Sequence, residues 1–203
     1  RSNQVKAYVW KQSGNSYKLR VMLALLQVPH EEIMVDFPGG EHKQPAFLKL
    51  NPRGQVPVLV DGDLVLWDSS AGLVYLARKF GGEQWLPTPP AEMAQVMNWV
   101  AFSGNEMLFG LQHARRGVMR NVWTLGNLEQ CQAAGRIALD VLEQRLKKND
   151  WLALGRPTIA EVACYAYAET APEGKIALDP YPATVAWLAR CKALPQWPAR
   201  WKY

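Results

Sequence analysis

The chain has 203 residues, 49% of them hydrophobic and 20% charged, which is typical of a globular protein rather than a disordered one. Its formal net charge is +5, but the basic residues are scattered, so we expect no nucleic-acid partner. No apolar run reaches the roughly 20 residues of a membrane span, and no signal-peptide pattern opens the chain. We therefore expect a cytoplasmic protein without a membrane partner.

Strand and helix signals alternate over the first 80 residues. Asp61-Gly62-Asp63 joins two of the strand signals as a favourable hairpin turn. The order is strand, helix, strand, followed by strand, strand, helix, which predicts a small mixed sheet with helices packed on it. A parallel pair of strands needs the first helix as its crossover. The six signals cover residues 5–10, 16–26, 32–36, 55–60, 64–67 and 69–80.

The second half carries helical patterns only. Residues 81–90 are rich in Gly, Pro and Thr, which is typical of a linker. Thr158 and Glu161 have the spacing of a capping box at the start of a helix. We predict an α/β domain over residues 1–81, a linker over 82–90 and an all-α bundle over 91–203. The expected helices cover residues 91–120, 128–147, 159–169 and 182–193.

The three cysteines, Cys131, Cys164 and Cys191, are far apart and lie in segments with helical patterns. No CxxC or Cys/His spacing typical of zinc sites occurs, so we expect no metal and no disulfide. Buried thiols in a reducing compartment fit this pattern best.

Several short motifs together carry a family resemblance. They are Ser13-Gly14-Asn15-Ser16, Gly39-Gly40-Glu41-His42-Lys43, Asn51-Pro52-Arg53-Gly54-Gln55-Val56-Pro57, Asp68-Ser69-Ser70 and the cap motif near Thr158. With them the chain resembles cytosolic glutathione transferases, most closely the serine-type classes such as phi and zeta. The resemblance covers both halves. It implies a thioredoxin-like βαβ-ββα domain before the helical domain, glutathione as co-substrate, a small electrophilic second substrate and a homodimer.

The resemblance also implies roles for single residues along a bound glutathione. It implies a cis bond between Val56 and Pro57, with the Val56 backbone pairing with the cysteinyl part of the ligand. Without the resemblance, Pro57 within an apolar run would indicate an edge strand or a bulge. His42 and Lys43 are expected near the glycyl carboxylate and Gln55 near the peptide, although all three could be ordinary loop residues.

Asp68 and Ser69 open a helix, where either residue is an ordinary cap. The amides at a helix start also bind anions. We expect Ser69 to bind the γ-glutamyl carboxylate and Asp68 the ammonium group. The family more often has Glu at position 68, so the ammonium contact is less well supported by the resemblance.

Ser13 aligns with the thiol-activating serine of the serine-type classes. Asn15 is a second candidate, and Tyr8 is a rival that lies about one residue out of register and should face the wrong way. Turn chemistry alone would explain Ser-Gly-Asn-Ser, and we expect Ser16 to be the helix cap. The electrophile is expected near Trp10 and the helix at 105–116, with Phe102, Met107, Leu108 and Phe109 as possible lining residues.

Two functions remain open from the sequence. The first is an enzyme that ionises the glutathione thiol through Ser13 and transfers it to an electrophile or exchanges it with a disulfide. The second is a module that binds glutathione or a protein on the same fold without turnover.

Overall fold

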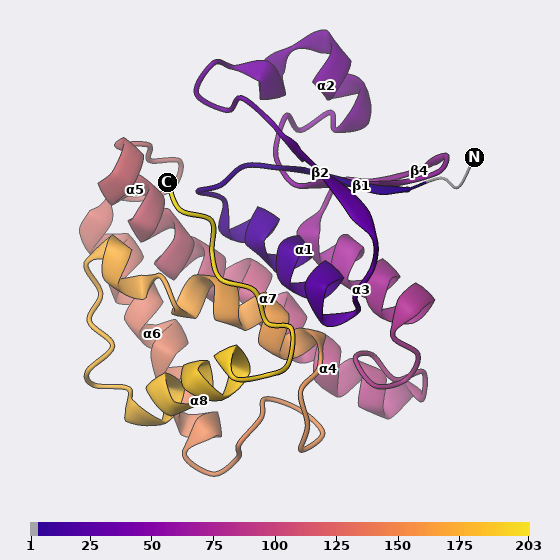
Figure 1. The fold of residues 1–203 in the computed structure, drawn as a ribbon. Helices are drawn as coiled ribbons and strands as arrows, with labels where there is room; N and C mark the ends of the chain where they lie inside the picture. The colour runs from indigo at the N-terminus through magenta and orange to yellow at the C-terminus, as the bar shows by residue number, and fades with distance from the viewer. Residues whose placement is uncertain (1–3) are drawn as a thin grey trace. The chain divides into compact units, whose positions relative to one another are not determined.

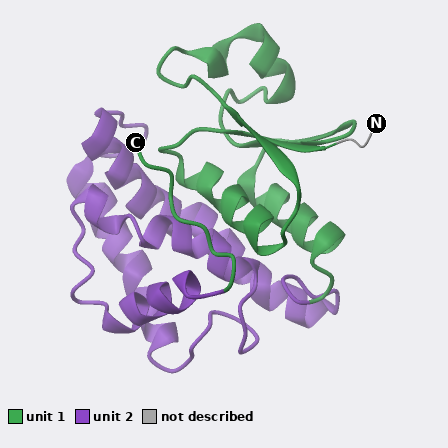
Figure 2. Cartoon of the chain, viewed as in Figure 1, with its two compact units in different colours: residues 1–83, 195–203 green, residues 84–194 purple. Residues whose placement is uncertain are grey.

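A computed structural model describes residues 4–203. The chain divides into two compact units (Figure 2), one of residues 1–83 with 195–203 and one of residues 84–194. We expected a helical domain that runs to residue 203. The structure instead groups the last nine residues, Pro195–Tyr203, with the first unit.

The first unit contains a four-stranded mixed sheet in the order β2-β1-β3-β4. Strands β1 and β2 are parallel, and the β1–β3 and β3–β4 pairs are antiparallel. Gly62, with φ of +61°, makes the β3–β4 turn. This arrangement confirms the expected thioredoxin-like domain. The strands are β1 (Val5–Val9), β2 (His30–Met34), β3 (Val58–Asp61) and β4 (Leu64–Leu66).

Helices cover both faces of this sheet (Figure 1). Helices α1 (Gly14–Leu25) and α3 (Ser69–Phe80) lie on one face, and α2 (Pro45–Leu50) lies on the other. The alternation of side chains along β1 explains why both faces are apolar. Val5, Ala7 and Val9 are buried on one face. On the other face Tyr8 packs into the cluster that contains Phe47 of α2.

The structure differs from the sequence prediction at two places in this unit, the start of β3 and the segment that follows β2. The pattern indicated a strand from residue 55, but β3 begins at Val58, directly after a cis Val56–Pro57 bond. Proline has no amide hydrogen for a ladder, so the strand begins beyond it. The short 3-10 helix η1 (Glu41–Lys43) and helix α2 were not predicted, because each is too short to show a helical period.

The second unit is entirely helical in the structure, as expected. The single helix expected over residues 91–120 contains a π-helical middle, η2, which widens the helix before the α-helical pattern resumes. Beside it, a β-carbon at Gly110 would lie 2.2 Å from the backbone nitrogen of Gly135, so η2 and α6 approach closely there. The elements are α4 (Pro90–Phe102), η2 (Ser103–Gln112), α5 (His113–Arg120), α6 (Leu128–Leu146), α7 (Ile159–Ala168), η3 (Ala171–Gly174) and α8 (Pro182–Lys192).

The predicted capping box at the start of α7 is confirmed. The Ala160 amide donates to the Thr158 hydroxyl at 3.2 Å, and the Thr158 amide donates to the Glu161 carboxylate at 2.8 Å. Glu161 also accepts from the Leu152 amide at 2.7 Å, and its side chain is fully buried. Burial raises the pKa of Glu161 to about 7, against the opposing effect of these bonds.

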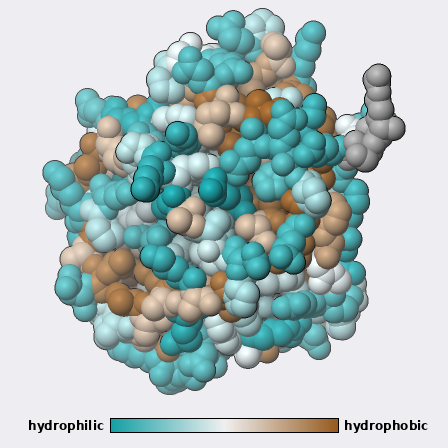
Figure 3. All heavy atoms as spheres, in the orientation of Figure 1, coloured by the Kyte–Doolittle hydropathy of each residue, from teal (hydrophilic) through white to brown (hydrophobic). Residues whose placement is uncertain are grey.

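Hydrophilic residues predominate on the face drawn in Figure 3, and hydrophobic residues appear there in separate patches. Among residues 4–203, no helix is both long and apolar enough to cross a membrane.

Candidate functional site

The loop between β1 and α1 holds Ser13 at the start of the helix. The Ser13 hydroxyl accepts from the Ser16 amide at 3.0 Å, so Ser13 is the N-cap of α1. The expectation that Ser16 caps the helix was wrong, because its buried hydroxyl accepts from the Trp10 amide at 3.1 Å. A serine hydroxyl also has one hydrogen to donate. The cap therefore leaves Ser13, which is half-buried, able to donate to a further group.

The start of α3 lies against the start of α1. Asp68 is the N-cap of α3, and its carboxylate accepts from the Ser70 amide at 2.8 Å. The Ser69 hydroxyl donates to the side-chain oxygen of Asn15 at 3.2 Å. Two helix starts that are 54 positions apart in sequence therefore meet through Asn15 and Ser69. Their amides give this region a positive potential, which suits a carboxylate or a thiolate.

Arg53 is a polar neighbour of this region that the sequence did not single out. Its guanidinium lies 3.2 Å from the Asp68 carboxylate and 5.8 Å from the ring centre of Trp67. The ion pair is about half exposed on both sides, so its contribution to stability is small. Arginine in the Asn-Pro-Arg-Gly motif was visible in the sequence. Its pairing with Asp68 depends on the tertiary fold and gave no local signal.

The loop before β3 is held by Asn51, which is only 1% exposed. Its side chain donates to the Gln55 carbonyl at 2.7 Å and accepts from the Arg53 amide at 2.9 Å. Gly54 has φ of +59°, and a β-carbon there would lie 2.9 Å from both the Lys43 ammonium nitrogen and the His42 carbonyl oxygen. The loop therefore requires glycine at this position. The close approach places the exposed Lys43 side chain beside this loop, in which Gln55 is exposed and Val56 and Pro57 are buried.

His42 is fixed by aromatic stacking. Its ring lies 3.7 Å from the ring of Phe37, with 5° between the planes, and Phe37 stacks on Trp10 at 4.6 Å. The stack connects the loop after β2 with the end of β1. It fixes the plane of the His42 imidazole, and both His42 and Lys43 carry groups that can donate hydrogen bonds.

Tyr8 lies on the α2 face of the sheet. Its ring packs edge-on to Phe47 at 6.4 Å. Tyr8 packs against the cluster that contains Phe47 and Val56. The choice of Ser13 over Tyr8 as the thiol-activating hydroxyl stays a prediction.

The possible lining residues for a second substrate have different environments within the helical unit. Met107 is fully buried in the core, so it was misplaced as a lining residue. Phe109 is 42% exposed. Phe102 borders an open groove of about 410 Å³ together with Trp99 and Glu106. Among residues 4–203, no group of three or more His, Cys, Asp or Glu side chains could hold a metal ion.

A thioredoxin-like unit with this cluster of helix starts, followed by an all-helical unit, defines a class of two-domain protein. Residues 3–78 match the glutathione S-transferase N-terminal domain, and residues 128–195 match the glutathione S-transferase C-terminal domain. The chain belongs to the glutathione S-transferase family.

Full-length comparisons agree with this assignment. Glutathione S-transferase 1 of Manduca sexta is 33% identical over 181 residues, which covers 86% of this chain and 81% of that protein. A possible glutathione S-transferase from Rhodopseudomonas palustris has a crystal structure that matches with a TM-score of 0.90 at 34% identity, over 98% of this chain and 99% of that one. A glutathione transferase from Phanerochaete chrysosporium, in complex with oxidized glutathione, matches with a TM-score of 0.86 at 27% identity, over 96% and 93% of the two chains.

Proposed function

We propose that the protein is a serine-type glutathione transferase that binds glutathione on its first unit, stabilises the thiolate through Ser13 and transfers it to a small electrophile. The observation that carries the proposal is the meeting of the α1 and α3 starts through Asn15 and Ser69. It gathers a donor hydroxyl, two sets of helix-start amides and an acidic cap in one region. The relative from Phanerochaete chrysosporium that was crystallised with oxidized glutathione supports the choice of ligand.

Thiolate stabilisation follows from the chemistry of Ser13. The glutathione thiol has a pKa near that of free cysteine, about 8.5. A hydrogen bond to a charged group contributes about 1.5–3 kcal/mol, and one pKa unit corresponds to about 1.36 kcal/mol. A hydroxyl that donates to the sulfur therefore lowers the thiol pKa by roughly one to two units. The positive end of α1 acts in the same direction.

The γ-glutamyl end of glutathione fits the start of α3. The Ser69 amide and hydroxyl would bind the carboxylate at the positive end of α3, with the hydroxyl hydrogen turning from Asn15 to the ligand. Asp68 would bind the ammonium group. Its present partner, Arg53, would share the carboxylate or move aside.

The rest of the tripeptide would extend along the loop that Asn51 organises. Val56 would pair with the cysteinyl backbone, and His42, Lys43 and Gln55 would surround the glycyl carboxylate. In the transfer step, the sulfur forms a bond to an electrophilic carbon while a leaving group departs with the electron pair of its bond. With a disulfide, the same sulfur forms a mixed disulfide and releases the other sulfur as a thiolate.

We also propose a homodimer in the cytoplasm. Two of the nine tryptophans, Trp67 and Trp123, are exposed and could serve as interface anchors, and sedimentation would measure the mass. The three cysteines are buried free thiols in the structure, which suits a reducing compartment.

The alternative is a binding module on the same fold that does not turn over. The test compares the parent chain with Ser13→Ala and Ser13→Thr by calorimetry with glutathione and by turnover with electrophiles and disulfides. We expect Ser13→Ala to keep glutathione affinity within about threefold and to lose about 10- to 100-fold in kcat/KM. Ser13→Thr keeps both the hydroxyl and the cap, so it should retain most activity. Equal activity of the alanine variant would contradict the assignment of Ser13, and a parent that binds glutathione without any turnover would favour the binding module.

A further inference from the structure

The last nine residues, Pro195–Tyr203, belong to the first unit although they follow α8 of the second. We call them the C-terminal segment. They form no helix or strand and are the yellow trace that ends at the C label in Figure 1. Their described hydrogen bonds reach Tyr17 of α1 and Glu32 of β2. The segment therefore belongs to the unit that carries the candidate site, although it is the last part of the chain.

The first contact of the C-terminal segment is with Tyr17 of α1, which is only 1% exposed. The Tyr17 hydroxyl donates to the Pro198 carbonyl at 2.7 Å. The ring of Trp201 packs edge-on to the Tyr17 ring at 6.4 Å, and the Arg200 guanidinium lies 4.2 Å from the Tyr17 ring centre. A buried tyrosine needs a partner for its hydroxyl, and here the segment supplies it.

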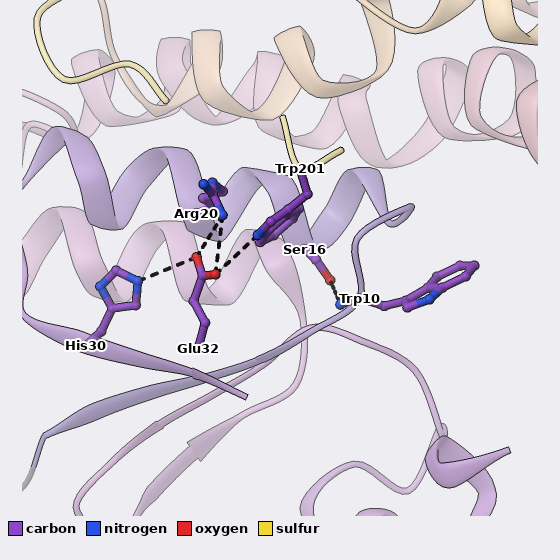
Figure 4. Close-up of polar contacts among 6 residues, drawn as sticks. All are labelled: Trp10, Ser16, Arg20, His30, Glu32 and Trp201. Carbon is purple, nitrogen blue, oxygen red and sulfur yellow. Dashed lines mark hydrogen bonds and ion pairs between the residues drawn. The ribbon is translucent and has the colours of Figure 1, made fainter. Parts of the chain in front are cut away.

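The second contact is a polar cluster around Glu32 of β2 (Figure 4). The Trp201 indole donates to the Glu32 carboxylate at 3.2 Å, and the Arg20 guanidinium lies 3.3 Å from the same carboxylate. The Arg20 guanidinium also lies 4.6 Å from the centre of the Trp201 ring. Trp201 is therefore held between a cation on α1 and an anion on β2, and it ties the two elements together.

The residues that the C-terminal segment contacts on α1 are connected to Ser13 within the first turns of the helix. Tyr17 and Arg20 are three positions apart on α1, so they lie on the same face of the helix. The Tyr17 amide donates to the Ser13 carbonyl at 3.0 Å. In the same turn, the Ser16 amide donates to the Ser13 hydroxyl. The Ser16 hydroxyl accepts from the Trp10 amide, as Figure 4 shows. A shift of α1 therefore moves the Ser13 hydroxyl with it.

We propose that the C-terminal segment is a positioning element for Ser13, in which Trp201 and Pro198 fix α1 and thereby the direction of the Ser13 hydroxyl. The proposal rests on the proposed function for the role of Ser13. Hydrogen bonds weaken steeply outside their normal geometry, and a misplacement of about 1 Å can cost roughly 100-fold in rate. Fixing the helix is therefore a direct way to control thiolate stabilisation without touching glutathione.

The test compares the parent chain with three variants: Trp201→Ala, Trp201→Phe and a truncation that ends at Leu194. Lys202→Ala is the matched control, because Lys202 is exposed and adjacent to Trp201 in the same segment. Trp201→Phe keeps an aromatic ring against Arg20 and Tyr17 but removes the indole donor to Glu32.

The first measurement is amide hydrogen exchange without any ligand, which does not depend on the proposed function. We expect Trp201→Ala and the truncation to speed exchange over residues 16–20 by about tenfold, with Trp201→Phe in between and Lys202→Ala unchanged. Unchanged exchange in both Trp201→Ala and the truncation would overturn the proposal, whatever the enzyme does.

The second measurement is the pH profile of kcat/KM for the electrophile at saturating glutathione, which reports the thiol pKa in the enzyme–glutathione complex. We expect the apparent thiol pKa to rise by about 0.5–1 unit in Trp201→Ala, with a smaller rise in Trp201→Phe and none in Lys202→Ala. A Trp201→Ala variant that is less stable but keeps the parent profile would show a structural role only and would overturn the positioning claim. If the parent has no activity with glutathione, the proposed function fails, and the exchange measurement alone decides whether the segment holds α1.

Discussion

Two helix starts in this protein use a hydroxyl cap in different ways. At α7, Thr158 accepts from the Ala160 amide and donates to Glu161 at 3.3 Å, and the whole group is buried. At α1, the described contact of the Ser13 hydroxyl uses only its acceptor capacity, and the side chain is half-buried. A hydroxyl cap therefore stabilises the fold at α7, where a buried acid completes its bonds. At α1, where no acid does so, we propose that the hydroxyl donates to the ligand.

The largest expected effect is a loss of stability when the cap of α7 is broken. Glu161→Ala leaves the buried Leu152 and Thr158 amides without their acceptor. Each unsatisfied buried group costs about 1–3 kcal/mol, so we expect the free energy of unfolding to fall by about 2–6 kcal/mol in urea titrations. Glu129→Ala is the control, because Glu129 is an exposed acid in the first turn of α6. Similar losses in both variants would contradict the claim that the buried acid completes the α7 cap.

The next effect is on ligand binding at the start of α3. Ser69→Ala removes the hydroxyl that binds Asn15 and that we assign to the γ-glutamyl carboxylate. We expect glutathione to bind about 10-fold more weakly by calorimetry, because a hydrogen bond to a charged group is lost. Ser70→Ala, one position on in the same helix turn, should change affinity by less than about twofold. Equal effects of the two substitutions would remove Ser69 from the site.

A smaller effect is expected at Asp68. Asp68→Asn keeps an acceptor for the Ser70 amide, so the cap survives, but it removes the negative charge that Arg53 now contacts. We expect glutathione affinity to fall about three- to fivefold, since the site is exposed and the ammonium contact is screened. Titrations at low and high salt should show the loss shrinking as salt rises. Unaltered affinity at low salt would place the ammonium group elsewhere.

The smallest effect concerns pH and the polar cluster beneath the C-terminal segment. The Glu32 carboxylate, 3.8 Å from the His30 ring nitrogen, raises the pKa of His30, while burial and Arg20 oppose the shift. The stability from this contact is therefore present below the unfolded pKa of 6.5 and is lost as pH rises through the raised folded pKa. We expect His30→Gln to cost less than about 1 kcal/mol at pH 6 and less still at pH 9, measured by urea titration. A cost that grows with pH would contradict this sign.

Local patterns predicted the parts of the molecule that depend on near neighbours. The Thr158–Glu161 capping box and the Asp61-Gly62-Asp63 turn are each contained in four residues or fewer, and both were found. The cis Val56–Pro57 bond was expected from the family resemblance alone. The cap of α1 was expected at Ser16 and lies at Ser13, because a helix start shifts easily by a residue or two when only propensity defines it.

The parts that the sequence did not predict depend on distant partners. Trp201 and Glu32 are 169 positions apart, and Arg53 and Asp68 pair only because the loop before β3 folds onto the start of α3. The π-helical turn at η2 accompanies close packing of Gly110 on Gly135, which no helical period reports. Contacts of this kind are fixed by the tertiary fold and leave no spacing in the chain.

The most direct test of the account is the pKa of the glutathione thiol when it is bound to the parent chain and to Ser13→Ala. The ultraviolet absorbance of the thiolate, followed against pH, reports this pKa without any second substrate. We expect a pKa about one to two units below the free value in the parent and a return to within about half a unit of the free value in Ser13→Ala. The same lowered pKa in both proteins would contradict the central claim that the Ser13 hydroxyl stabilises the thiolate.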